Sequence, residues 1–182
     1  MGVKEVEPVM EAVKAPGSNP EIVLERLIRE NEISLKRLCY LYLHDEALAE
    51  DAVQETFLKA YRALEGYRGE ASEKTWLTRI AVNTCKDMLR SAWFRHVDRR
   101  VTADMIPESR DIRDPYNREV AAAVMNLPGK YREVILLYYY RGLTMAETAE
   151  VLKISQPAVT NRLKRARDKL KTELKGGGID EE

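Results

Sequence analysis

The sequence predicts an all-α protein with two small helical domains joined by a flexible linker. Apolar residues recur at three- and four-residue spacing through two long stretches of the 182-residue chain, without the alternation typical of strands. A polar segment with two prolines, residues 95–116, separates the stretches and predicts the linker. We therefore expect a bundle of three or four helices over residues 20–94, a second helical domain over residues 117–175, and mobile ends at residues 1–19 and 176–182.

Composition narrows the class of protein further. Apolar residues make up 45% of the chain, which is enough for packed cores, but no run approaches the ~18 residues that span a bilayer. The N-terminus lacks the apolar segment and cleavage site of a signal peptide. Cys39 and Cys85 fall on apolar helix faces, as buried thiols of a reducing compartment do. We expect a cytoplasmic protein.

The sequence shows no spacing of cysteines and histidines that is typical of a zinc site. Two cysteines and two histidines, His44 and His96, do not have the spacing of a zinc site. We expect no metal, no cofactor and no small-molecule substrate.

The first domain is predicted to contain three principal helices. The first begins after Asn19, a helix cap followed by a proline, and ends at His44. The second covers about residues 46–64. After a loop that contains glycines at positions 66 and 69, Ser72 is expected to cap a third helix that reaches about residue 93.

A polar stripe runs along this third helix, apart from its apolar face. Arg79, Asn83, Lys86 and Arg90 are spaced four, three and four residues apart, and Trp76 stands beside them. Aromatic rings next to cations suit single-stranded nucleic acid, because bases stack on rings and cations follow phosphates. The stripe alone is equally compatible with a core tryptophan and cations that pair with acids elsewhere.

The second domain ends in a predicted helix-turn-helix. A helix is expected near residues 117–125 and another over residues 131–141, started by Pro128 and stopped by Gly142. Thr144 and Glu147 then form a capping-box pattern. Residues 153–155 interrupt the periodicity, and Ser155 is a cap for a second, longer helix.

The longer helix combines an apolar stripe with a basic face. Between residues 153 and 171 there are seven basic residues and one acid. A solvated surface helix is the ordinary alternative, but helices stabilised by internal ion pairs alternate their charges. The one-sided charge therefore favours DNA binding in a major groove.

Charge is unevenly distributed although the total is zero, with 30 basic and 30 acidic residues. Residues 21–93 hold 11 basic and 13 acidic residues, whereas residues 118–174 hold 11 basic and 6 acidic residues. A slightly acidic domain joined to a basic one indicates that a second partner, other than DNA, binds the acidic surface.

Two blocks of sequence carry a family resemblance. The segments AEDAVQETFLKAYRALEGYRGEASEKTWLTRIAVNTCKDMLR and LPGKYREVILLYYYRGLTMAETAEVLKISQPAVTNRLKRARDKL, in this order, resemble bacterial sigma factors of the extracytoplasmic-function class. The resemblance covers roughly residues 20–174. It implies a protein that binds core RNA polymerase, recognises two promoter elements as duplex and as melted strand, and promotes strand opening. It also implies control by an anti-sigma factor, often a membrane-anchored one.

The resemblance assigns roles to three groups of residues. The group that would dock on polymerase is Asp51, Gln54, Glu55 and Leu58. The group that would hold the melted minus-ten element is Tyr67, Lys74, Trp76, Arg79, Asn83, Lys86 and Arg90. The group that would read the minus-thirty-five duplex is Gln156, Thr160, Asn161, Arg162, Lys164 and Arg165.

Some positions depart from the family pattern. Lys153 stands in the turn where glycine is common, so we expect either a slightly different turn or a left-handed backbone at Lys153, at some cost. Glu73 stands where an aromatic residue usually precedes the Thr75–Trp76 pair, and Pro157 replaces a small residue. These changes lie at or beside the reading surfaces, so the promoter sequence stays open.

Two other classes of function were weighed. A stand-alone helix-turn-helix regulator would use its N-terminal half as a ligand pocket or dimer surface, and the block over residues 49–90 argues against that. An enzyme such as a nuclease would need clustered carboxylates or a nucleophile beside a base, whereas the acids here are scattered over helix faces. The sequence therefore predicts a sigma factor and not an enzyme.

Overall fold

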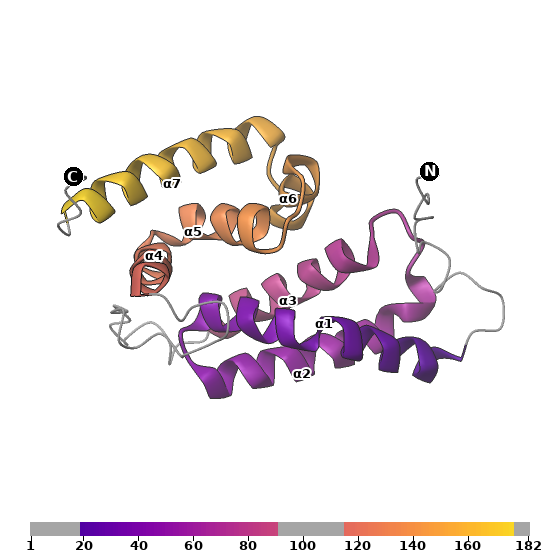
Figure 1. The fold of residues 1–182 in the computed structure, drawn as a ribbon. Coiled ribbons are helices and arrows are strands. Elements are labelled where there is room, and N and C mark those ends of the chain that lie inside the picture. Colours follow the sequence, from indigo (N-terminus) through magenta and orange to yellow (C-terminus); the bar gives the residue numbers. More distant parts are fainter. Residues whose placement is uncertain (1–18, 91–114, 177–182) are drawn as a thin grey trace, which may run out of the picture.

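A computed structural model of the chain describes residues 19–90 and 115–176, and within them every regular element is helical, as predicted. Of the predicted linker over residues 95–116, only residues 115 and 116 are described, and they begin a helix; residues 1–18 and 177–182 at the chain ends also lie outside the described residues. The elements in chain order are α1 (Pro20–Leu43), α2 (Glu46–Ala63), η1 (Leu64–Gly66), α3 (Glu73–Arg90), α4 (Pro115–Asn126), α5 (Gly129–Ile135), η4 (Leu136–Tyr140), α6 (Met145–Leu152) and α7 (Gln156–Gly176) (Figure 1).

Helices α1 and α2 begin and end where the sequence predicts. The Asn19 side chain accepts a hydrogen bond from the amide of Glu21, and Pro20 occupies the first turn of α1. His44 ends α1 in a left-handed conformation, with φ 57°, and its amide donates to the carbonyl of Tyr40. Asp45 then caps α2 by accepting from the amide of Leu48. The reversal between the helices therefore needs only two residues.

The N-terminal half is a bundle in which α1 packs against both α2 and α3. Leu27, Leu35 and Leu38 of α1 are fully buried in it, and Leu77 of α3 faces them from the other side of the core. The two cysteines are buried as predicted. Their thiols, Cys39 on α1 and Cys85 on α3, hydrogen-bond to each other, and this bond and burial raise the pKa of Cys85 well above its usual range. The Cys85 thiol is therefore kept protonated within the core.

The expected helix over residues 131–141 is a composite. Helix α5 ends at Ile135 and continues as a single π-helical turn, η4, in which the amide of Arg141 donates to the carbonyl of Leu136 at 2.9 Å. The wider turn lets Leu136 and Leu137 both face the core, while Tyr139 and Tyr140 stay exposed. Gly142 stops the segment with φ +64°, as predicted.

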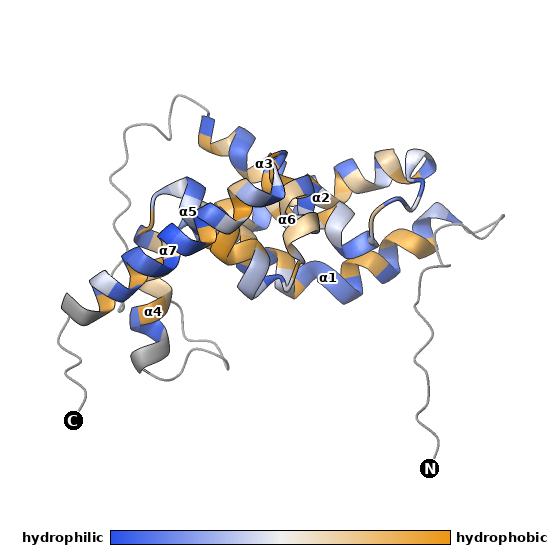
Figure 2. Cartoon of the chain, turned by 90° about the horizontal axis from the view of Figure 1, so that it is seen from above, coloured by the Kyte–Doolittle hydropathy of each residue, from blue (hydrophilic) through white to orange (hydrophobic). Residues whose placement is uncertain are grey.

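The two halves pack directly on each other. Helix α3 contacts α6, α1 contacts η4, and a continuous apolar core links Leu77 of α3 with Leu137 and Ala149 of the C-terminal half. Helix α7 lies on the side of α5 that faces away from α1, α2 and α3 (Figure 1). Its outer surface is mostly hydrophilic (Figure 2). The fold therefore places α2 and α7 on opposite sides of the molecule.

Candidate nucleic-acid interface

Helices α6 and α7 form the predicted helix-turn-helix. The Thr144 hydroxyl accepts from the amide of Glu147 at 3.2 Å, and the Glu147 carboxylate accepts from the amide of Thr144 at 2.9 Å, which completes the capping box. Lys153 ends α6 with φ 55°, so of the two alternatives for this turn the structure has the left-handed backbone. Ser155 caps α7 by accepting from the amide of Ala158. Each end of the short turn is thus fixed by its own hydrogen bonds.

One face of α7 is anchored and the other is open. Val159, Leu163 and Ala166 are fully buried against α5 and α6. The predicted reading residues lie on the opposite face, where Arg162 is half-buried and all the others are exposed. Within the described residues, Arg162 and Lys164 have no hydrogen-bond or ion-pair partner, whereas Arg165 donates to Tyr131 and lowers the pKa of that phenol. This face presents cations and amides at the spacing that a major groove accepts.

The α3 stripe has a different environment. Trp76 is only 6% exposed and packs on Tyr67, with the ring centroids 4.7 Å apart. The Tyr67 hydroxyl donates to the carbonyl of Ala71, which holds the loop between η1 and α3. In this conformation Trp76 is a core residue and has no free ring face for a base. The structure thus places Trp76 in the core, and its role toward a melted strand stays a prediction.

Two cations of the stripe are paired with acids of the C-terminal half. Arg79 Nη1 lies 2.7 Å from Glu150 Oε1 of α6. Lys86 Nζ lies 3.1 Å from Glu133 Oε1 of α5. Both pairs bridge the two halves, and both cations stay partly exposed to solvent. The structure thus brings together cations from residues 79–86 with acids more than forty residues away in the chain.

The remaining residues of the predicted minus-ten group are more accessible. Asn83 is exposed and, among the described residues, has no hydrogen-bond partner. Arg90 is exposed and pairs with Asp87 on its own helix. Lys74 is exposed beside Gly142, and burial together with the like charge of Arg141 lowers its pKa. The group is therefore divided between two cations, Arg79 and Lys86, that pair with the C-terminal half, and residues at both ends of α3 that do not.

A hydrogen bond adds to the bridge between α3 and α6. Thr75 Oγ1 donates to Glu147 Oε1 at 2.6 Å, and the same carboxylate caps α6 through Thr144. The bond from Thr75, followed by those from Thr144, lowers the pKa of the Glu147 carboxyl. Glu147 therefore serves the helix-turn-helix and the contact between the two halves at once.

Arg141 is a buried cation at the junction of the halves. It is 4% exposed, and its guanidinium donates to Thr78 Oγ1 of α3 and to Ser34 Oγ of α1. No carboxylate pairs with it among the described residues. Desolvation accordingly lowers the pKa of Arg141. The buried charge of the Arg141 guanidinium is therefore compensated only in part, by hydrogen bonds to two hydroxyl oxygens.

The predicted polymerase-docking group lies together on the outer face of α2. Asp51, Gln54 and Leu58 are exposed, with Leu58 51% exposed, and Glu55 is half-buried and pairs with Lys59. The opposite face of the helix is buried, including Ala52, Val53 and Phe57. The exposed side chain of Tyr61 continues this face by one turn. A large apolar side chain among acids on an open helix face suits a protein partner.

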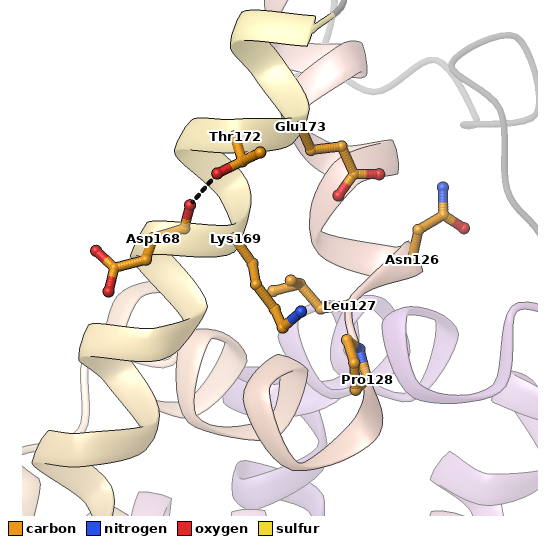
Figure 3. A pocket seen from close by; sticks show the side chains of 7 residues that line it. All are labelled: Asn126, Leu127, Pro128, Asp168, Lys169, Thr172 and Glu173. Carbon is orange, nitrogen blue, oxygen red and sulfur yellow. Dashed lines mark hydrogen bonds between the residues drawn. The ribbon is translucent and has the colours of Figure 1, made fainter.

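An open groove of about 460 Å³ lies where the α4–α5 corner meets α7 (Figure 3). The Lys169 side chain runs toward Leu127 and Pro128, whereas Asp168 points away from them (Figure 3). No nucleophile stands beside a base among its lining residues. Within residues 19–90 and 115–176, no cluster of three or more His, Cys, Asp or Glu side chains could hold a metal ion. No helix in the same ranges is long and apolar enough to cross a membrane.

Sequence reasoning missed the acids and the arginine that cover α3. The capping-box pattern indicates only a capping role for Glu147, and no local pattern indicates a role for Glu133, Glu150 or Arg141. Their partners lie 47 to 107 residues away, a separation illustrated by Arg79 with Glu150 (71 residues) and Arg141 with Ser34 (107 residues). The only available signal was that the basic half keeps acids at residues 147 and 150, one turn apart on a single helix.

Comparison with protein families finds two matches. The model for sigma-70 region 2 matches residues 27–95, and the model for sigma-70 region 4 matches residues 117–170. The region 2 match covers most of the α1–α3 bundle, including the exposed face of α2 and the polar stripe of α3. The region 4 match covers the helix-turn-helix, including the exposed face of α7.

Whole-chain comparisons point the same way. The RNA polymerase sigma-H factor of Pseudomonas aeruginosa is 32% identical over 156 residues, covering 78% of this chain and 81% of that protein. The ECF RNA polymerase sigma-E factor of Haemophilus influenzae is 34% identical over 138 residues, covering 68% and 73%. Among solved structures, CnrH in complex with the cytosolic domain of CnrY gives a TM-score of 0.69 at 26% identity, covering 92% of this chain and 94% of that one.

A second solved structure shares the fold. The sigma factor RpoE in complex with the anti-sigma factor NepR from Bartonella quintana gives a TM-score of 0.68, covering 86% of this chain and 99% of that one. Its identity of 20% makes it a likeness of fold alone.

Proposed function

The chain belongs to the extracytoplasmic-function class of sigma-70 factors, and from this premise we propose which of its surfaces bind polymerase, duplex DNA and melted DNA. It is a transcription initiation factor that directs RNA polymerase to promoters. The observation that carries the assignment of surfaces is their placement. The acidic, partly apolar face of α2 and the basic face of α7 lie on opposite sides of the molecule (Figure 1).

The α2 face is the proposed contact with polymerase. Leu58 gives it an exposed apolar centre, and Asp51 and Gln54 flank this centre with polar groups. Interfaces of this kind draw most of their binding energy from a few central side chains. The proposal also supplies the second partner that the charge difference between the halves requires.

The open face of α7 is the proposed reader of the upstream duplex. Gln156, Thr160 and Asn161 lie at the start of the helix, where recognition helices contact base edges. Arg162 and Lys164 follow without an internal partner among the described residues, so they are available for phosphates or guanines. The two kinds of contact respond differently to salt, which makes them separable by experiment.

Helix α3 and the loop before it are the proposed site for the melted downstream strand. The support is the arrangement of Arg79, Asn83 and Lys86 along one side of the helix, where the Asn83 side chain is exposed. Holding an unstacked base costs a few kcal/mol, which stacking and hydrogen bonds have to recover. The proposal also divides the chain into a first domain over residues 20–94 and a second over residues 117–175, with a linker over residues 95–116 between them.

We further propose that an anti-sigma factor controls the protein, and that the protein itself acts in the cytoplasm. The support is that CnrH, at 26% identity, was solved with the cytosolic domain of CnrY. A membrane-anchored partner would hold the chain at the inner face of the membrane without requiring a spanning helix of its own.

Run-off transcription with purified core polymerase tests the proposal. We expect promoter-dependent transcript only when this chain is present, and we expect Leu58→Ala to weaken core binding by about tenfold. Ile33→Ala is the matched control, because Ile33 is an apolar side chain of α1 that is 70% exposed and lies outside the proposed interface.

Two results would contradict the assignment of surfaces. Equal core binding by Leu58→Ala and Ile33→Ala would show that α2 is not the docking face. Binding of the free chain to promoter duplex with full regulatory effect and no need for polymerase would favour a stand-alone regulator, which the region 2 match over residues 27–95 disfavours.

A further inference from the structure

We propose that Tyr131 and Tyr139 are positioning residues, whose hydroxyls aim two arginines of α7 at the two phosphate backbones of the upstream duplex. The arginines are Arg165 and Arg167, named here the flank arginines. The inference rests on the proposed reading role of α7. It adds Arg167 and the two tyrosines, which lie outside the predicted reading group, to the contact with DNA.

The flank arginines leave α7 on opposite sides. They stand on either side of Ala166 in the chain, and the Ala166 side chain is fully buried. Successive residues of an α-helix are rotated by about 100°, so each arginine points about 100° away from the buried direction, one to each side. Both residues are exposed. The open face of α7 lies between the two flanks, so the arginines frame the residues that would contact base edges.

A tyrosine of the α5–η4 segment holds each flank arginine. Arg167 Nε donates to the hydroxyl of Tyr139 at 2.8 Å, and the guanidinium carbon lies 5.5 Å from the centroid of the same ring. On the other flank Arg165 donates to the hydroxyl of Tyr131, and this hydrogen bond and the charge of Lys130 lower the pKa of the phenol. The same kind of contact therefore occurs on both flanks of one helix.

The π turn decides where Tyr139 lies. Over eight residues a regular α-helix would rotate Tyr139 by about 80° from the direction of Tyr131. The π turn closes with the bond from the amide of Arg141 to the carbonyl of Leu136, one residue wider than an α-helical bond, so it takes up part of this rotation. Single π turns of this kind are frequent at functional sites. Here the irregular turn supplies the second tyrosine to α7.

A phenol orients an arginine without neutralising it. Tyr139 engages only Nε of Arg167, so the two terminal nitrogens keep their N–H donors in the fork that matches phosphate oxygens. Within residues 19–90 and 115–176, neither flank arginine pairs with a carboxylate. Both charges therefore remain available to an anion.

Arginines that are oriented before DNA arrives bind it more tightly. A free arginine side chain loses rotamer freedom when it contacts a phosphate, and that loss weakens binding. The contacts with Tyr131 and Tyr139 restrict the flank arginines in advance, so less freedom is lost. A helix that fills the major groove has one backbone along each flank. Arg165 and Arg167 therefore contact phosphates of opposite strands.

The test uses the chain bound to core polymerase and a duplex that carries only the minus-thirty-five element, cut from the promoter of the run-off assay. Arg165→Ala and Arg167→Ala each remove one phosphate contact and should reduce the salt slope of binding by about one. Tyr131→Phe and Tyr139→Phe remove only a hydroxyl, so they should lower affinity about twofold to tenfold with an unchanged slope. Tyr140→Phe is the control, because Tyr140 belongs to the same turn and is 40% exposed.

Double variants show whether the tyrosines act through the arginines. Adding Tyr139→Phe to Arg167→Ala, or Tyr131→Phe to Arg165→Ala, should cause no further loss, because the hydroxyl then has no arginine to orient. Neutral methylphosphonate groups, placed one at a time in the duplex, locate the contacted phosphates. The sensitive position that is lost in Arg165→Ala should lie on one strand, and the position lost in Arg167→Ala should lie on the other.

Several results would overturn the inference. Additive losses in the double variants would show that the tyrosines do not act through the flank arginines. Sensitive phosphates on one strand only would contradict a contact with both backbones. Unchanged salt slopes in both arginine variants, while the complex still binds the duplex, would show that Arg165 and Arg167 do not touch DNA. Absence of any upstream binding by the complex would remove the proposed role of α7 and this inference with it.

Discussion

Helices α7 and α3 carry the two proposed nucleic-acid faces, and the structure presents them in opposite states. On α7 the cations Arg162 and Lys164 lack internal partners among the described residues, and the apolar stripe of the helix is buried on the other side. On α3 the cations Arg79 and Lys86 are paired with acids of the other half, and Trp76 is in the core.

The difference suggests an order of events. A reading face that is open in the free chain can search duplex DNA before any rearrangement. Strand binding by α3, as proposed, would require Arg79 and Lys86 to leave their pairs with Glu150 and Glu133.

Trp76→Ala is expected to have the largest effect of the variants that compare α3 with α7. Because the ring is 6% exposed and packs on Tyr67, its removal is expected to lower the free energy of unfolding by about 3–5 kcal/mol. Chemical denaturation measures the loss. Tyr61→Ala serves as the control, since Tyr61 is 41% exposed and its removal should cost little. Equal stability of the two variants would mean that Trp76 is not a core residue in solution.

Arg162→Ala and Lys164→Ala address the open face. Each is expected to weaken binding of the upstream duplex by about 1–3 kcal/mol if it reads a base, or to reduce the salt slope by about one if it contacts a phosphate. Titrations at several salt concentrations distinguish the two cases. Lys130→Ala is the comparison variant, because Lys130 is an exposed cation of α5 that stacks over Tyr131. Unchanged affinity and slope would place both side chains away from DNA.

Arg141→Met tests the contact between the two halves by removing a buried charge that destabilises it. The change removes a buried charge while Thr78 and Ser34 keep hydrogen bonds to the carbonyls of their own helices. We expect the packed arrangement of the halves to gain about 1 kcal/mol. The gain would be seen as weaker strand binding and as higher energy transfer between fluorescent labels on Glu32→Cys of α1 and Glu173→Cys of α7, which are both exposed positions. Lower energy transfer in this variant would show that Arg141 holds the halves together.

Glu147→Gln has the smallest expected effect, and that effect depends on pH. The folded state lowers the pKa of Glu147 below its usual 4.5, so the ionised carboxylate stabilises the fold above the unfolded pKa and loses that contribution as pH falls through the folded pKa. Near pH 7 the free energy of unfolding of the unmodified chain should exceed that of the variant by less than about 1 kcal/mol. In acid the two free energies should converge. A difference that stays constant from pH 7 to pH 3 would contradict this role.

Local signals in the sequence predicted most of the fold. Asn19, Ser72, Thr144 and Ser155 lie before helices, and each side chain accepts a hydrogen bond from an amide of the first turn. These caps act within three residues, so they are legible without tertiary structure. The π-helical turn at residues 136–140 was not predicted, because its hydrogen bonds depend on which leucines the core selects.

The candidate sites were predictable only where they face solvent. The α2 and α7 faces follow from helical periodicity, which separates buried from exposed positions. The pairing of Arg79 with Glu150 depends on how two helices 71 residues apart are packed, and no local pattern encodes that. The sequence accordingly left the environment of the α3 stripe open.

The affinity of the melted minus-ten strand for the free chain, compared with its affinity for the chain bound to core polymerase, tests the contrast most directly. Core polymerase alone and an Arg79→Ala complex serve as controls for binding by polymerase itself. If α3 is covered in the free chain and released on docking, the free chain should bind the strand at least about tenfold more weakly, while it still binds the upstream duplex. Equal strand affinities in the two states would contradict the account.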